Sequence, residues 1–138
     1  MQPTHHQTHQ AGRHIAVAEA LIRGHRAELG PFTRTYVLVD GIKAQVQVAA
    51  KGAWQIENVD QYTDASIAVN ILVDMTGDLR KVYICPGAEL REQVRERHRQ
   101  FLAAHDDRRP RNPFSKHTAI YPEQVRAWHN NWQLFAAL

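Results

Sequence analysis

The feature that most constrains this chain is a hairpin signature in residues 35–50, where the dipeptide Asp40-Gly41 joins two β-rich segments. Asp-Gly favours the tight turn whose twist matches that of two antiparallel strands. The second segment, AQVQVAA, alternates polar and apolar side chains, as a strand with one buried face does. The sequence therefore predicts a β-hairpin here and a fold built on a sheet.

A second antiparallel pair is predicted further along the chain. The segments SIAVNILVDM and KVYICPG flank Thr76-Gly77-Asp78, a set of residues typical of a turn. The first segment is almost continuously apolar, which favours a strand buried on both faces. Together, the two hairpins predict a central mixed four-stranded sheet.

Helical periodicity flanks these strands. Apolar residues at helical spacing predict a first helix over about residues 13–23, with Gly24 as its stop. An amphipathic helix is predicted after Pro86-Gly87, and Pro122 is suited to the first turn of a closing C-terminal helix. The inward residues of the amphipathic helix are expected to be Leu90, Val94, Phe101 and Leu102. The fold class is therefore α/β (α+β), in the order helix, hairpin, hairpin, helix, loop, helix.

The 138 residues suffice for a single domain, which we expect to occupy residues 12–138. Residues 1–11 are polar and rich in histidine, and we expect a disordered tail that offers no fixed geometry for a metal ion. Cys85 is the one cysteine, which excludes a disulfide within the chain and predicts a buried free thiol. The sequence has neither a signal peptide nor an apolar run of about 18 residues, so we expect a cytoplasmic protein without a membrane partner.

A series of segments in this sequence resembles a family of small bacterial PD-(D/E)XK nuclease-like proteins. In chain order they are GRHIAVAEALIRGH (12–25), YVLV (36–39), VQVAAKGAWQI (46–56), NILVDM with KVYICP (70–86), VRERHRQFL (94–102) and NWQLF (131–135). The resemblance implies a restriction-endonuclease-like core and a single nuclease-like domain over residues 12–138.

Active enzymes of this kind bind Mg²⁺ through carboxylates at strand ends and use a lysine to polarise the attacking water. The resemblance places the first-helix glutamate at Arg13, the metal-binding aspartate at Tyr36, the second ligand at Gln47 and the lysine at Ala49. Only Gln47 retains a group that the family uses, and Arg13 would repel a cation. The resemblance therefore implies a catalytically inactive module without a cofactor, which binds nucleic acid or a protein partner.

Two alternatives stay open at this stage. The segment QVQVAA fits a strand whose small residues simply pack under Trp54. Alternatively, catalysis has moved to Lys51, two residues beyond Ala49, and to Glu57, which would give a Mg²⁺-dependent DNA endonuclease. DNA cleavage that requires a divalent metal and Glu57 would distinguish this enzyme from the inactive module.

The net charge of +3 is mild, but cations gather in residues 91–116. We expect this basic region to contact nucleic-acid phosphates without reading sequence. Its members are Arg91, Arg95, Arg99, Arg108, Arg109, Arg111 and Lys116. The alternative is a solvated helix face on which Glu92 and Glu96 pair with the arginines. The sequence predicts neither the oligomeric state nor the identity of a partner.

Overall fold

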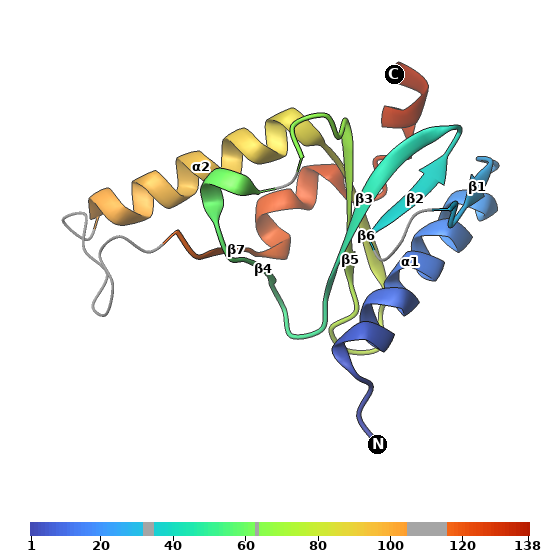
Figure 1. Ribbon diagram of the computed structural model, residues 1–138, viewed down its shortest axis with the longest axis horizontal. Coiled ribbons are helices and arrows are strands. Elements are labelled where there is room, and N and C mark those ends of the chain that lie inside the picture. The colour runs from blue at the N-terminus through green and yellow to red at the C-terminus, as the bar shows by residue number, and fades with distance from the viewer. Residues whose placement is uncertain (32–34, 63, 105–115) are drawn as a thin grey trace.

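The computed structural model describes residues 1–31, 35–62, 64–104 and 116–138, which form two helices, seven strands and three 3-10 segments (Figure 1). The elements are α1 (His5–Ile22), β1 (Ala27–Glu28), β2 (Tyr36–Val39), β3 (Ile42–Ala49), β4 (Trp54–Ile56), η1 (Val59–Gln61), β5 (Val69–Asp74), β6 (Lys81–Pro86), α2 (Gly87–Ala104), β7 (Thr118–Ile120), η2 (Pro122–Trp128) and η3 (Trp132–Ala137). None of the helices described is long and apolar enough to cross a membrane.

The main sheet is mixed and has the strand order β1-β2-β3-β5-β6. Both predicted hairpins are confirmed. Strands β2 and β3 pair antiparallel around Asp40 and Gly41, which both have positive φ angles, and β5 pairs antiparallel with β6. Strands β3 and β5 pair in parallel, which makes the sheet mixed as expected. The predicted count of four strands is wrong, because β1 adds a two-residue strand that is too short to show a periodic pattern.

The sheet lies between two layers (Figure 1). Helix α1 covers one face, where Ala16 and Ala20 pack with Ile71 and Val73 of β5. Helix α2 and the small β4–β7 sheet lie on the other face, where a second core cluster contains Leu72. Consecutive side chains of β5 thus enter opposite cores, which confirms the strand buried on both faces.

Helix α1 begins at His5, so residues 5–11, which we expected to be disordered, are helical. A capping box explains the early start. The Thr4 hydroxyl accepts from the Gln7 backbone N–H at 3.1 Å, and the Gln7 side chain accepts from the Thr4 N–H at 2.9 Å. Gly12 then allows close contact with β3, since a Cβ atom at this position would lie 2.2 Å from Cγ2 of Val48.

The C-terminal segment is not the single helix that the sequence predicts. Asn130 has a φ of 52° and separates two 3-10 segments, η2 and η3. Its N–H donates to the Val82 carbonyl at 2.9 Å, and the Asn131 side-chain amide donates to the Ile84 carbonyl at 3.2 Å. The helix is therefore interrupted where the backbone docks on β6, the outer strand of the sheet.

Helix α2 matches its prediction in extent, and Leu90 and Val94 are buried as expected. Phe101 is an exception, because 40% of its surface is exposed. The small sheet of β4 and β7 was not predicted, since three-residue strands carry too little pattern to be recognised.

Candidate functional site

A hollow of about 750 Å³ follows one edge of β3, and we call it the β3 groove. Within the described part of the chain, β2 pairs with β3 only over residues 42–45, so the following residues have β5 on one side and the groove on the other. The residues that line it are Pro3, His5, Thr8, His9, Thr35, Gln45, Val46, Gln47, Val48, Ala50, Lys51, Ala53, Trp54, Gln55 and Glu57. Because residues from both faces of β3 line it, the groove wraps around the strand edge.

The first wall of the β3 groove is the N-terminal half of α1. The Nε2 atom of His9 lies 3.1 Å from the carbonyl oxygen of Val46, and it must donate because a carbonyl only accepts. Burial lowers the pKa of His9, the hydrogen bond to Val46 opposes this shift, and the neighbouring charges of His5, Arg13 and His6 lower the pKa further. The neutral ring is therefore favoured at neutral pH, in the form that ties α1 to β3.

The floor of the groove contains two amide side chains, Gln45 and Gln47, which point to the same side of β3. The Tyr62 hydroxyl donates to Oε1 of Gln47, and burial raises the pKa of Tyr62, so this donor stays protonated. Oε1 of Gln45 is buried and has no hydrogen-bond partner among the described residues. The same holds for Nδ2 and Oδ1 of Asn70, the residue opposite Gln45 on β5.

The second wall is formed by the segment between β3 and the end of β4. Gly52 turns the chain there with a φ of 86°, and its N–H donates to the Thr76 hydroxyl at 2.7 Å. Trp54 is 1% exposed, and its indole N–H donates to the Val73 carbonyl at 3.2 Å. Lys51 is exposed on this wall.

The charge of the groove follows from the two chain segments that supply most of its lining. Residues 1–18 and 41–56 contain no aspartate or glutamate. Their charged or titratable residues are Arg13, Lys43, Lys51, His5, His6, His9 and His14. Glu57 is the one acidic side chain among the described residues that line the groove. The described lining thus holds one lysine and one glutamate, and the excess of positive charge in these two segments comes from Arg13 and Lys43, which do not line the groove.

The resemblance to nucleases assigns catalytic roles to four positions, and two of them meet in the structure. Arg13 is only 5% exposed, and its guanidinium donates to the Tyr36 carbonyl at 2.7 and 3.2 Å, to the Leu29 carbonyl at 3.3 Å and to Oε1 of Gln10 at 2.7 Å. The ring of Tyr36 carries the Lys43 ammonium 4.1 Å from its centroid. A guanidinium and a ring already facing a cation are not magnesium ligands.

The other two positions, Gln47 and Ala49, lie on the same face of β3. Gln47 is held by Tyr62, and Ala49 is 1% exposed in the same core cluster as Trp54. This packing agrees with the structural explanation of the segment QVQVAA. The four positions together do not fit a magnesium ion, because none of them offers a carboxylate.

The fallback residues Lys51 and Glu57 both line the β3 groove, together with Gln47. The structure therefore brings together the one retained family position and both residues to which catalysis could have moved. Within the described ranges, however, no three or more His, Cys, Asp or Glu side chains form a group that could hold a metal ion.

The cations of α2 make contacts within the chain. Arg91 donates to the carbonyl oxygens of Asp64, Ala65 and Ile67 at 3.0 to 3.2 Å, so it fastens α2 to the loop before β5. Arg99 forms an ion pair with Glu96, as the solvated-face alternative predicts.

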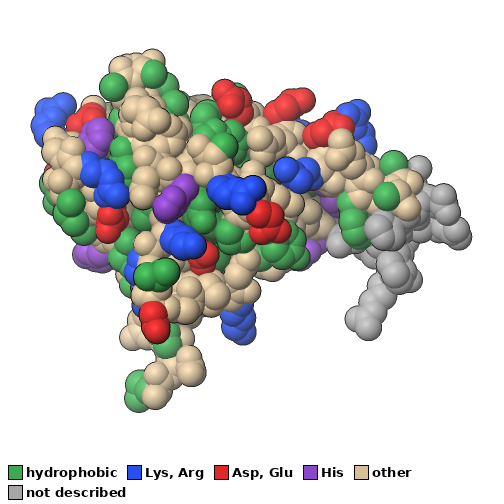
Figure 2. Space-filling view, turned by 180° about the vertical axis from the view of Figure 1, so that it is seen from behind, with side chains coloured by type: hydrophobic (Ala, Val, Ile, Leu, Met, Phe, Trp, Pro, Cys, Tyr) green, Lys and Arg blue, Asp and Glu red, His purple; other side chains and the backbone are tan. Residues whose placement is uncertain are grey.

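The rest of the basic region is less uniform than the sequence suggests. Lys116 lies 2.7 Å from a carboxylate oxygen of Asp60, and this contact is the first cause that lowers the pKa of Asp60. Arg95 is exposed on α2. The predicted phosphate contacts Arg108, Arg109 and Arg111 lie outside the described residues. Figure 2 shows basic and acidic side chains intermixed over the face that it displays. The described part of the region thus gives little support for a dedicated phosphate surface.

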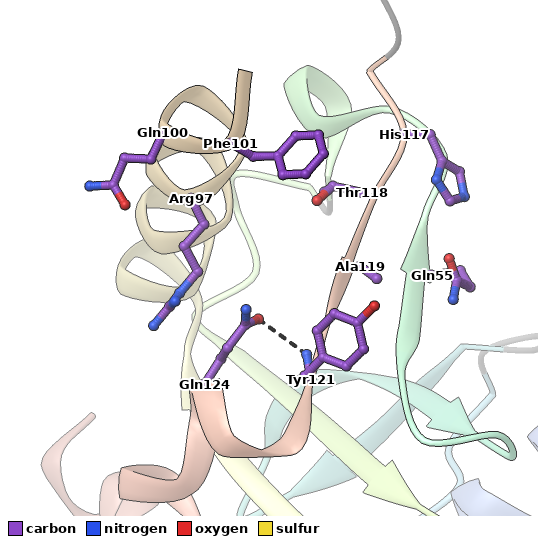
Figure 3. Close-up of a pocket in the computed structure, with 9 residues that line it drawn as sticks. All are labelled: Gln55, Arg97, Gln100, Phe101, His117, Thr118, Ala119, Tyr121 and Gln124. Atoms are coloured by element: carbon purple, nitrogen blue, oxygen red, sulfur yellow. Dashed lines mark hydrogen bonds between the residues drawn. The ribbon is translucent and has the colours of Figure 1, made fainter. Parts of the chain in front are cut away.

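A second hollow, of about 500 Å³, lies between the end of α2 and β7 (Figure 3). Phe101 points toward β7, and Gln100 points away from it. Tyr121 is 48% exposed, and its backbone N–H donates to Oε1 of Gln124 at 3.1 Å. Gln55 of β4 lines both this hollow and the β3 groove.

Comparison with known proteins identifies no relative, since no family model, curated protein or solved structure matches this chain. The resemblance to PD-(D/E)XK nucleases therefore stays a prediction from the sequence.

Proposed function

We propose that this protein is a non-catalytic, nuclease-like domain that binds nucleic acid in the β3 groove. The observation that carries this proposal is the composition of the two chain segments that supply most of the lining of the groove. Residues 1–18 and 41–56, which supply most of the lining, contain lysine, arginine and histidine but no carboxylate, and Glu57 is the one acidic residue among the described residues of the lining; the chain as a whole has 14 acidic residues. An electropositive concave surface attracts polyanions and raises the rate of their association.

We infer the absence of catalysis from the structural contacts that the side chains at the four family positions make. Arg13 hydrogen-bonds the edge of β2, Tyr36 faces Lys43, Gln47 accepts from Tyr62, and Ala49 fills the core. Each side chain contributes to the stability of the fold. Replacing these groups by metal ligands would require new partners for all of their present contacts.

Lys51 is the residue that we expect to contact a phosphate group. It is exposed on the wall of the groove, and its flexible ammonium group acts as a point charge toward phosphate.

Fluorescence anisotropy with labelled single strands and duplexes of about 12 nucleotides tests this proposal, because such lengths cover the site sizes of small binding domains. We expect Lys51→Gln to weaken binding by about threefold to tenfold and to lower the slope of log K against log salt by about one. The exposed Arg126→Gln, which removes the same charge from η2, is the matched control and should change affinity less than about twofold. A failure of every oligonucleotide to bind at low salt would exclude nucleic acid and favour a protein partner.

A second candidate function is the Mg²⁺-dependent DNA endonuclease, supported by the position of Lys51, Glu57 and Gln47 along one groove. The two candidates differ in a plasmid or single-strand cleavage assay with Mg²⁺ or Mn²⁺. Cleavage that disappears in EDTA and in Glu57→Ala would replace the binding module by the enzyme. Under the proposed function, the wild-type chain leaves both substrates intact.

A further inference from the structure

We infer that the floor of the β3 groove binds the edge of an unpaired nucleobase, so that the ligand is single-stranded rather than duplex nucleic acid. This inference rests on the proposed function and specifies the ligand of the same site. It starts from the polar atoms that the fold leaves without partners.

Three buried polar atoms belong to two residues that are paired across neighbouring strands. Oε1 of Gln45 and both polar side-chain atoms of Asn70 have no hydrogen-bond partner in the described part of the chain, and Asn70 is 0% exposed. The two residues face each other in the register of β3 and β5. Most buried polar groups in folded proteins are hydrogen-bonded, so this cluster calls for a donor or acceptor that enters from outside. Gln45 also lines the groove, so a turn of its amide side chain would bring the buried Oε1 to a ligand there, whereas Asn70 does not line it.

The floor offers complementary hydrogen-bonding groups in a row. Gln45 presents an acceptor, its buried Oε1. Gln47 presents a donor, because its Oε1 already accepts from Tyr62 and its amide nitrogen carries two N–H groups. These side chains are two positions apart on one face of β3, which corresponds to roughly 7 Å along a strand. A planar ligand with both an N–H donor and an acceptor along one edge satisfies this pattern, and nucleobases have such edges.

The concave shape selects an unpaired base. In a duplex, the Watson–Crick edges are already paired, and the remaining edges are reached by protein elements that project into a groove of the nucleic acid. Gln45 and Gln47 are instead part of the concave lining, on the face of β3 that carries Ala49 and is turned away from α1. A base reaches them only if it leaves the stack, as bases of single strands do readily. Lys51 would then hold a neighbouring phosphate while the amides read the base.

The test compares the affinities of oligo(dA), oligo(dC) and oligo(dT) of about 12 nucleotides and of a duplex, measured by anisotropy for four proteins. The wild type should bind single strands more tightly than the duplex. Among the three single strands, its affinity for the preferred base should exceed that for the least preferred base by about tenfold, the discrimination expected of a well-formed amide–base pair. Gln45→Leu should reduce the preference among bases to less than about threefold. Lys51→Gln should weaken all oligonucleotides alike, and Gln133→Leu, an exposed glutamine on η3, should match the wild type.

The outcomes separate this inference from the proposed function. Binding that is equal for single strand and duplex, or a base preference that Gln45→Leu leaves unchanged, overturns the inference while the nucleic-acid-binding function stands. A complete lack of binding overturns both. Should Gln45→Leu not fold, the side-chain amide resonances of Gln45 and Gln47 in the wild type give the answer. They should shift on saturation with the preferred oligonucleotide, and unchanged resonances would mean that only an internal water satisfies Gln45 and Asn70.

Discussion

Replacing Arg13 by methionine should destabilise the fold strongly, although the resemblance to nucleases treats this position as part of a catalytic centre. The guanidinium makes two hydrogen bonds to the Tyr36 carbonyl, one to the Leu29 carbonyl and one to Gln10, and the residue is 5% exposed. Methionine keeps much of the aliphatic stem, so the substitution chiefly removes the charged donors.

The magnitude follows from these contacts. Hydrogen bonds from a charged donor contribute roughly 1.5–3 kcal/mol, and a buried carbonyl left without its donor costs about 1–3 kcal/mol. The bond to Leu29 is long at 3.3 Å, so the bonds to Tyr36 and Gln10 should dominate. The free energy of unfolding should therefore fall by roughly 2–4 kcal/mol, a large fraction of the stability of a small domain.

Urea unfolding followed by circular dichroism measures this change. The control is Arg26→Met, an exposed arginine near β1, for which we expect a loss of less than about 0.5 kcal/mol. Equal unfolding free energies for Arg13→Met and the wild type would refute the structural role of Arg13.

Arg13→Glu introduces the carboxylate that the resemblance places here in an active nuclease. It therefore distinguishes a structural role of this position from a metal-binding one. We expect it to destabilise the fold more than methionine does, because a carboxylate would face the carbonyl oxygens of Tyr36 and Leu29. Millimolar Mg²⁺ should not recover this stability. Stabilisation of Arg13→Glu by Mg²⁺, without a similar effect on the wild type, would reveal a latent metal site and contradict our interpretation.

Three further predictions concern the core and the first hairpin. Gly87→Ala should lower the free energy of unfolding, measured in urea, by roughly 2 kcal/mol or more, because the added Cβ atom would lie 2.2 Å from the backbone oxygen of Ile67. An unchanged midpoint of urea unfolding would contradict this contact. Burial raises the pKa of Cys85, so its thiol should react with a disulfide reagent only in the unfolded protein, and rapid labelling of the native state would contradict the packing. The hydrogen bond from His25, at 2.6 Å, lowers the pKa of the Asp40 carboxyl below its value in the unfolded chain. This carboxylate therefore stabilises the fold above about pH 4, and the contribution is lost as the pH falls through the folded pKa. The melting temperature of Asp40→Asn should fall less between about pH 5 and 2 than that of the wild type. Parallel curves of melting temperature against pH for the two proteins would refute the linkage.

Local sequence signals predicted the elements whose structure is determined locally. Asp40-Gly41 gives the first hairpin because both residues tolerate the positive φ that the turn requires. The apolar run of β5 gives a strand buried on both faces. Neither β1 nor β4 could be predicted, because these strands of two and three residues form through tertiary pairing.

The sequence predicted residues on β3 and on the segment that follows it, but none on the α1 wall of the groove. Gln47 was assigned from the resemblance to nucleases, Lys51 from its two-residue spacing from Ala49, and Glu57 as a carboxylate that follows Trp54, and all three line the β3 groove. The opposite wall, with His5 and His9, was missed because polar residues with no apolar periodicity indicated a disordered tail. The Thr-His-His-Gln capping signature of residues 4–7 was the local signal that this segment is helical.

The role of Arg91 shows a different limit of sequence patterns. Its four-residue spacing from Arg95 places both on one side of a helix but gives no information on their contacts. In the structure, Arg91 binds the backbone carbonyls of a loop more than 20 residues away in the chain. Such a contact depends on how α2 packs against the sheet, which no local pattern specifies.

The most direct test of nucleic-acid binding in the β3 groove is a titration of the ¹⁵N-labelled wild-type protein with a single-stranded oligonucleotide of about 12 nucleotides. We predict that the backbone amide shifts concentrate in residues 5–9 and 45–51, the two walls and the floor of the groove. Shifts that concentrate instead on the exposed face of α2, around Arg95 and Arg99, or a spectrum that does not change at all, would contradict the account.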